Sequence, residues 1–291
     1  MEKEEETVNH DSSSSSNGAG GSSGNDAHDA ENWQATEGAI EFVNLSLFYD
    51  ATATSASDAT LKKLNLKIAA GAKVGVVGRT GAGKSSLIIA LLRLALTTGE
   101  VLIDGRATWT LPLKKLRKLM SLIPQDPVLF SGTVRKNLDP FNQSDEQSLW
   151  CAIESAQLKP CIVQLGGLDA EVQEFGSNFS VGERQLICLA RAILRPTSIL
   201  ILDEATANVD KTTDAVIQAV IREKFADCTV ITIAHRLDTV IDSDMIVVMD
   251  NGRVVESGPP LTLLANDGGE FSKLYAASKQ ASTDGEDGST D

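Results

Sequence analysis

The sequence predicts an α/β protein with a parallel-sheet core, an antiparallel β layer and an inserted helical subdomain. A β-rich run at 73–78 leads at once into a glycine loop and a helix-like segment at 85–96, the order of strand, loop and helix found in α/β folds. Further candidate strands for the core end near turns or polar residues, at 101–105, 119–124, 198–203, 230–234 and 245–250. The pattern between Trp150 and Pro196 is mostly helical, and we place the helical insertion at about 130–196.

Two segments with alternating side chains, one on each side of the polar stretch at 50–60 (DATATSASDAT), predict the antiparallel layer. Residues 38–49 (GAIEFVNLSLFY) alternate apolar and polar side chains, as an edge strand does. Residues 61–68 (LKKLNLKI) alternate again. No internal repeat is visible in the sequence, so we expect one domain of this kind, spanning residues 37–277.

The two ends of the chain differ in composition from this domain. Residues 1–36 are acidic and Ser/Gly-rich, and residues 278–291 are acidic. Neither segment has the apolar residues that would offset the entropy of ordering, so we predict two disordered tails. The tails carry most of the net charge of −14, and the domain has no basic excess that would favour binding to nucleic acid.

The sequence also bears on where the protein works. Its first residues, MEKEEE, lack the apolar core of a secretory signal and the basic character of a transit peptide. No apolar run approaches the roughly 18 uncharged residues that a membrane helix requires, so we expect no direct membrane span. The 4 cysteines show no CxxC spacing, which is typical of reduced thiols. We therefore expect a cytoplasmic protein without a disulfide or metal–thiolate framework.

The glycine loop GRTGAGKSS matches the pattern G-x-x-x-x-G-K-[ST] between a strand and a helix. Chance would produce this match about 1% of the time in a chain of this length, so a plain glycine turn with a surface lysine is the weaker interpretation. Backbone N–H groups and the helix start suit phosphate oxygens, Lys84 can reach the β and γ phosphates, and the Ser85 hydroxyl can ligate Mg²⁺. The loop predicts a triphosphate site on a P-loop NTPase (RecA-like) core, formed by Gly78, Arg79, Thr80, Gly81, Ala82, Gly83, Lys84, Ser85 and Ser86.

Two adjacent carboxylates follow the most apolar candidate strand, in ILILDEATANVD at 199–210. Charged groups seldom end a buried strand without a partner. Beside a phosphate loop, Asp203 can hold Mg²⁺ through its water shell, and Glu204 can orient or deprotonate an attacking water. An acidic helix N-cap is the alternative interpretation of the pair.

The segment NFSVGERQLICLARAIL at 178–194 resembles the signature of an ATP-binding-cassette (ABC) nucleotide-binding domain. The resemblance runs from Glu37 to about Ala277, with the motifs in the family's order. GRTGAGKSS, LIPQDPVLFSGTVRKNLDP and FSVGERQ are similar to the second nucleotide-binding domain of the multidrug-resistance-associated (C-type) exporters. The resemblance implies an ATPase that uses ATP and Mg²⁺.

The resemblance also implies roles for three residues outside the phosphate loop. Tyr49 matches the aromatic residue that stacks on adenine, with Phe48 as the competing candidate. Gln125 matches the glutamine that touches magnesium or the attacking water, although before Asp-Pro it could be only a turn residue. His235 matches the switch histidine that contacts the γ phosphate, and a structural cap is the alternative.

The signature departs from the common Leu-Ser-Gly-Gly-Gln of the family. Ser180 and the backbone of Gly182, at a helix start, can still present donors to a γ phosphate. Val181 adds bulk, however, and Glu183 is expected to place an anion near that phosphate and weaken the site. Asp210 matches the loop that contacts the opposite subunit, and it can also serve as the N-cap of a following helix.

The resemblance implies a motor domain that pairs with a second nucleotide-binding domain, in a homodimer or with a different domain, and drives the transmembrane domain of an exporter. Such a domain works at the cytosolic face of a membrane. Glu204, His235, Gln125 and Lys84 are then the expected catalytic residues. Two other functions stay open at this point: a soluble ABC ATPase without a transport role, and an ATP-binding interaction module with little turnover.

Overall fold

The computed structural model describes residues 37–50, 58–205, 209–234 and 236–284, without the side chains of 281–284. The predicted tail at 1–36 and His235 lie outside the described residues. In the described part of the chain, no helix is long and apolar enough to cross a membrane.

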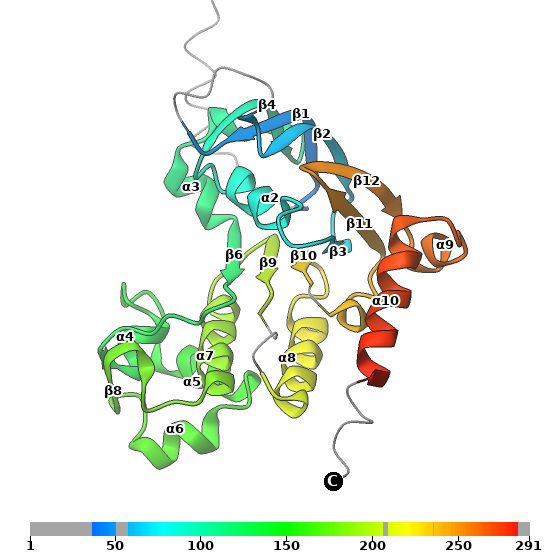
Figure 1. The fold of residues 1–291 in the computed structure, drawn as a ribbon. Helices are drawn as coiled ribbons and strands as arrows, with labels where there is room; N and C mark the ends of the chain where they lie inside the picture. Colours follow the sequence, from blue (N-terminus) through cyan, green and yellow to red (C-terminus); the bar gives the residue numbers. More distant parts are fainter. Residues whose placement is uncertain (1–36, 51–57, 206–208, 235, 285–291) are drawn as a thin grey trace, which may run out of the picture. The chain divides into compact units, whose positions relative to one another are not determined.

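The core is a six-stranded sheet that is parallel except at one edge, as Figure 1 shows for the row of β6, β9, β10, β3 and β11. The order is β12 (Arg253–Gly258), β11 (Met245–Asp250), β3 (Lys73–Val77), β10 (Thr229–Ile233), β9 (Ile199–Asp203) and β6 (Met120–Ile123). Only β12 is antiparallel to its neighbour. Ile233 lies opposite Asp203 on one side and Val76 on the other. The carboxyl ends of β3, β10 and β9 therefore meet at one edge, which confirms the predicted parallel core.

A four-stranded antiparallel sheet forms the second layer (Figure 1), in the order β2 (Leu61–Ile68), β1 (Ile40–Phe48), β4 (Leu96–Ile103) and β5 (Arg106–Ala107). The assignment of 101–105 to the parallel core is wrong, because this run pairs antiparallel with β1. The helix expected over 85–96 is also too long. Helix α2 (Lys84–Leu91) stops before Arg93, whose φ of 51° lies in the left-handed region and whose guanidinium donates to the carbonyls of Thr108 and Leu111.

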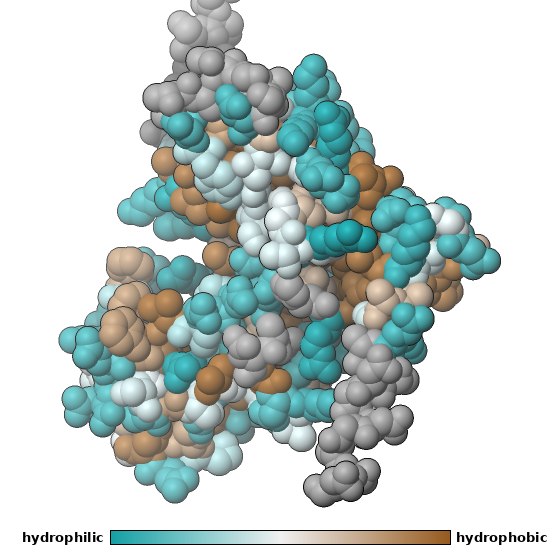
Figure 2. Space-filling view, in the orientation of Figure 1, coloured by the Kyte–Doolittle hydropathy of each residue, from teal (hydrophilic) through white to brown (hydrophobic). Residues whose placement is uncertain are grey.

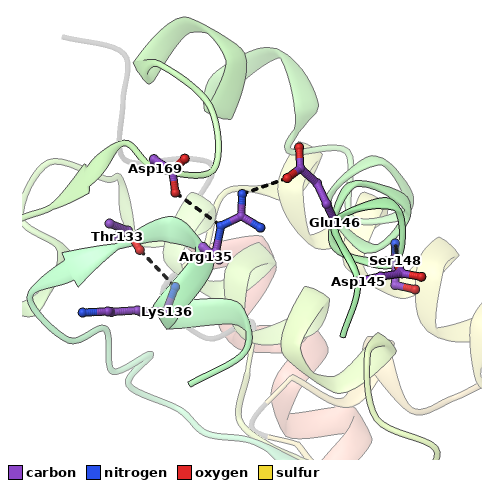
Figure 3. Close-up of polar contacts among 7 residues, drawn as sticks. All are labelled: Thr133, Arg135, Lys136, Asp145, Glu146, Ser148 and Asp169. Carbon is purple, nitrogen blue, oxygen red and sulfur yellow. Dashed lines mark hydrogen bonds and ion pairs between the residues drawn. The ribbon is translucent and has the colours of Figure 1, made fainter. Parts of the chain in front are cut away.

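The helical insertion contains β7 (Gly132–Thr133), α4 (Val134–Leu138), α5 (Glu146–Ser155), α6 (Lys159–Leu165), β8 (Glu171–Val172), η3 (Glu174–Gly176) and α7 (Val181–Ile193). Figure 3 shows how polar contacts join its parts: Arg135 of α4 donates to Glu146 of α5 at 3.0 Å and to Asp169 before β8 at 3.3 Å. These ion pairs are exposed and contribute little energy. Burial of Leu149, Ile153 and Ile162 in the large apolar core holds the insertion together.

The remaining elements are η2 (Thr108–Thr110), α3 (Leu113–Lys118), α8 (Lys211–Lys224), η4 (Leu237–Thr239), α9 (Pro260–Leu264) and α10 (Glu270–Asp284). Phe271 of α10 is fully buried in a cluster with Val77 and Ile246. The tail boundary placed at 278 is too early, since α10 continues to Asp284. The residues that extend it include Ala, Lys and Gln, which favour helix, together with Ser, Thr and Asp, which do not.

Candidate active site

The phosphate loop folds around the side chain of Lys84. Lys84 opens α2, is 6% exposed, and donates from Nζ to the carbonyls of Gly78 at 2.9 Å and Arg79 at 3.3 Å. Burial lowers the pKa of Lys84, and the nearby carboxylates of Glu204 and Asp203 partly oppose this. An ammonium group held under a curled glycine loop is suited to binding phosphate oxygens.

Gly78 is required at the point where the strand becomes the loop. Its φ of 148° lies in the region that favours glycine, and a Cβ there would lie 2.2 Å from the carbonyl oxygen of Met249. Gly83 has a φ of 102° and occupies the N-cap position of α2. The two glycines therefore set the path of the loop between β3 and α2.

The paired carboxylates lie at the end of β9, directly across from the phosphate loop. The Ser85 hydroxyl donates to Oδ1 of Asp203 at 3.5 Å. Burial raises the pKa of Asp203, with a further contribution from the neighbouring Glu204 carboxylate. Glu204 has a φ of 48°, and its N–H donates to the carbonyl of Ile233 in β10 at 3.1 Å. Both carboxylates thus sit at the sheet edge where Lys84 and Ser85 begin α2.

Tyr49 lies beside the phosphate loop at the end of β1. Its hydroxyl and that of Ser86 are 3.0 Å apart, and 59% of the tyrosine is exposed. Phe48, the alternative candidate, is the last residue of β1 and is half-buried. The contact with Ser86 therefore favours Tyr49 as the aromatic residue nearest the loop.

Gln125 is the second residue after β6, and a side chain of helix α7 holds its backbone. Gln185 of α7 donates from Nε2 to the carbonyls of Pro124 at 3.0 Å and Gln125 at 3.1 Å. Gln185 is 1% exposed. Gln185 was not predicted from the sequence as a functional residue. A signal was present, because Gly182, Gln185, Leu186 and Leu189 follow helical spacing on a buried face, where a polar side chain needs a partner.

Ser180 is the N-cap of α7, in a capping box with Glu183. The Ser180 hydroxyl accepts from the N–H of Glu183 at 3.2 Å, and Oε2 of Glu183 accepts from the N–H of Ser180 at 2.7 Å. Oε1 of Glu183 accepts from the thiol of Cys161 at 3.0 Å. In this conformation each oxygen of Glu183 accepts a hydrogen bond from its own chain, and these bonds favour the charged form of the carboxylate. The expected effect of Glu183 on a bound phosphate stays a prediction.

Cys161 is a second residue whose contact was not predicted from the sequence. Burial and the hydrogen bond to Glu183 raise the pKa of Cys161 to about 12. A thiol reacts as its thiolate, and a pKa that is about four units above pH 8 leaves roughly one thiol in 10⁴ ionised. We expect iodoacetamide at pH 8 to label the exposed Cys151 well before Cys161, as peptide mass spectrometry would measure. Equal labelling rates in the folded protein would contradict the Cys161–Glu183 contact, and urea-unfolded protein is the control.

Asp210 is the N-cap of α8. It accepts from the backbone N–H groups of Thr212 at 3.0 Å and Thr213 at 2.9 Å, and from both threonine hydroxyls. These bonds, led by the Thr212 hydroxyl, lower the pKa of Asp210 well below its usual range. Thr213 also lies against Gly182, where a Cβ would meet its methyl group at 3.1 Å. Asp210 therefore has the capping role, and the contact between Thr213 and Gly182 connects the start of α8 to the start of α7.

Lys84 is enclosed by a glycine loop after β3, and the Asp-Glu pair that faces it lies at the end of β9, two strands away in the sheet. This arrangement defines a P-loop nucleotide-binding protein. A helical insertion in which a serine is the N-cap of the last helix is a more specific feature than the phosphate loop. A family model described as "ABC transporter" matches residues 61–207, and the chain belongs to the ABC transporter family. The resemblance seen in the sequence is confirmed.

Individual relatives agree with this assignment. The chain is 54% identical over 251 residues to "Probable multidrug resistance-associated protein lethal(2)03659" of Drosophila melanogaster, covering 86% of this chain and 18% of that protein. It is 56% identical over 239 residues to "ATP-binding cassette sub-family C member 4" of Homo sapiens, covering 82% of this chain and 18% of that protein. The chain thus spans less than a fifth of the length of these relatives.

A solved structure shows the same fold. "Structure of a bacterial Atm1-family ABC exporter with ATP bound" matches with a TM-score of 0.78 and 34% identity, over 86% of this chain and 43% of that one. The chain is accordingly an ABC exporter nucleotide-binding domain, homologous to the multidrug-resistance-associated transporters, and belongs to a class of domain that binds and hydrolyses ATP. These findings favour the exporter class over the two other functions left open by the sequence.

Proposed function

We propose that Glu204 is the general base for ATP hydrolysis in this chain and that Lys84 binds the β and γ phosphates. The observation that carries the proposal is the meeting of four side chains at one sheet edge: Lys84 and Ser85 at the start of α2, and Asp203 and Glu204 at the end of β9. Lys84 stabilises the negative charge that develops on the γ phosphate, while Glu204 accepts a proton from the attacking water. By the family resemblance, His235 adds a contact to the γ phosphate.

The residues at this edge fit Mg²⁺. The Ser85 hydroxyl and the Asp203 carboxylate are hard oxygen donors that lie 3.5 Å apart and face one another. Within the described ranges there is no group of three His, Cys, Asp or Glu side chains that would hold a metal alone, which agrees with an ion bound by few protein ligands and by phosphates. Ser85, Asp203 and Gln125 are the proposed ligands, directly or through water. Mg²⁺ bound there would neutralise charge on the β and γ phosphates.

Tyr49 is the proposed adenine contact. Its exposed ring and its link to Ser86 place an aromatic face next to the loop without any hydrogen bond that would select one base. The other residues of the loop, from Gly78 to Ser86, cradle the phosphates through their backbone N–H groups. Tyr49 thus fixes the nucleoside end of ATP and the loop fixes the phosphate end.

A second nucleotide-binding domain is the proposed partner. This chain has one phosphate loop and one signature segment, and the family resemblance implies that each loop faces the signature of the opposite domain. Ser180 and Gly182 lie at the start of α7, and Asp210 lies at the start of α8, where Thr213 contacts Gly182. Glu183 is folded back into the capping box, and in this proposal the Ser180 hydroxyl and the backbone of Gly182 contact the γ phosphate of the second domain.

The transmembrane domain of an exporter is the other proposed partner, so the chain would work at the cytosolic face of a membrane. Three large apolar side chains around α4 are exposed: Val128 by 49%, Phe130 by 67% and Phe141 by 71%. Figure 2 shows apolar residues gathered on the surface near α4. Exposed apolar patches mark interaction surfaces, and this one continues from the Gln125 segment. Motion at Gln125 can therefore be transmitted to a partner seated there.

The ATPase rate per molecule, measured against protein concentration with Mg²⁺, tests this proposal. Pairing predicts a rate that rises with concentration and levels off once the dimer is saturated. The variant Glu204→Gln serves as the blank for contaminating activity. A rate per molecule that stays constant down to nanomolar protein would contradict a site shared between two domains.

A further inference from the structure

The contact between Gln185 and the Gln125 segment points to a positioning device. Gln185 belongs to α7, yet both carbonyls that it contacts belong to the turn after β6. Its two amide hydrogens are directed at consecutive carbonyls, of Pro124 at 3.0 Å and Gln125 at 3.1 Å. A single planar amide thereby fixes two successive peptide planes, including the one that carries Gln125.

Stability alone does not account for a glutamine at this position. Its Oε1 atom is buried, with no hydrogen-bond partner among the residues that the structure describes. A buried carbonyl group without a partner destabilises the folded state, and methionine would fill a similar volume without that cost. What methionine could not do is donate to the two carbonyls. The side chain is therefore suited to fixing the backbone at Gln125.

The far end of the same segment is held by the same helix. Arg191 of α7 donates from Nη1 to the carbonyl of Val128 at 2.7 Å and from Nη2 to Oδ1 of Asn137 at 2.8 Å. Asn137 in turn accepts from the N–H of Phe130 at 2.9 Å. The segment from Pro124 to Phe130 is thus attached to α7 at two points, and only the first point lies at Gln125.

We propose that Gln185 is a positioning residue that holds the backbone of Gln125 so that its side chain can reach the metal. This inference rests on the proposed role of Gln125. Since Ser180 is the N-cap of α7, the same helix carries the signature that is proposed to face the ATP of the second domain. Gln185 therefore ties the metal contact of one ATP site to the signature of the other.

Magnesium-dependent ATP binding tests the inference without any need for turnover. Calorimetry would compare the ATP affinity of the full chain in Mg²⁺ with its affinity in EDTA. For Gln185→Met we expect the gain in affinity given by Mg²⁺ to fall about tenfold, while affinity in EDTA is unchanged, since one charge-assisted contact is misplaced. Gln147→Met is the matched control, because Gln147 is an exposed residue of α5 in the helical insertion and should keep the full gain.

Two further variants keep the inference falsifiable. Gln185→Asn retains the amide but shortens its reach, so it should behave like Gln185→Met if position matters, even where methionine alters folding. In a Gln125→Ala background, Gln185→Met should cause no further loss of the Mg²⁺ gain. Hydrogen exchange should also increase at Gln125 and Asp126 but not at Phe130, whose N–H is held through Asn137.

The outcomes separate the inference from the proposal on which it rests. If Gln125→Ala leaves the Mg²⁺ gain intact, the proposed role of Gln125 fails and the inference fails with it. If Gln125→Ala reduces the gain but Gln185→Met and Gln185→Asn do not, only the inference is overturned. Additive losses in the double variant would likewise overturn it, because they would mean that Gln185 acts by another route.

Discussion

Replacing Glu204 with glutamine is expected to reduce ATP turnover by about 10² to 10⁴-fold, the usual contribution of a general base. The amide keeps the size of the side chain and cannot accept the proton of an attacking water. The backbone at this position is held by the N–H bond to Ile233 and has a φ of 48°, which the substitution does not change. ATP affinity should be unchanged or tighter, because one negative charge near the polyphosphate is removed.

The measurement is a steady-state rate of phosphate release at saturating ATP, together with ATP affinity by calorimetry. Glu223→Gln is the matched control, because Glu223 is an exposed carboxylate of α8 that pairs with Lys224 at 2.9 Å. The control should keep full turnover. Turnover in Glu204→Gln equal to that of the control would mean that Glu204 is not the base.

Replacing Lys84 with methionine is expected to weaken ATP binding about 10- to 100-fold, the worth of a hydrogen bond to a charged group. Methionine fills the buried space but supplies no donor to the phosphates. It also leaves the carbonyls of Gly78 and Arg79 without the ammonium that now holds them at 2.9 and 3.3 Å. The loop itself should therefore be less ordered in this variant.

Calorimetric titration with ATP in Mg²⁺ measures this loss. Lys67→Met is the matched control, since the Lys67 side chain is 79% exposed and reaches Glu41 only at 3.5 Å. ATP should bind the control as tightly as the unchanged protein. Tight binding by Lys84→Met would place the triphosphate away from this loop.

The order of strand, loop and helix around Lys84 was predictable because it depends on local sequence. Gly78 and Gly83 have positive φ values, which other residues adopt less easily. The apolar run of β9 is likewise visible in the sequence, where it ends at Asp203. The run at 101–105 was assigned to the wrong sheet because its alternation does not say which strand it will pair with. Pairing with β1 depends on long-range contacts.

The partners of side chains were harder to predict than their presence. Glu183 carries a charge in the sequence, and only the fold brings Cys161 to within 3.0 Å of it. Gln185 and Gln125 are likewise far apart in the chain, and their contact exists because α7 packs beside β6. A hydrogen bond across such a separation leaves no periodic trace in the sequence. The buried face of α7 did carry a signal, namely one polar residue in an apolar stripe.

ATP is expected to join two copies of this domain. Light scattering on Glu204→Gln, which should bind ATP without consuming it, measures this directly. In ATP and Mg²⁺ we expect a mass about twice the 30.9 kDa of the chain, returning to that of a single chain when EDTA removes the metal. A mass that stays at one chain, with ATP shown to be bound, would contradict the pairing of two copies of this chain.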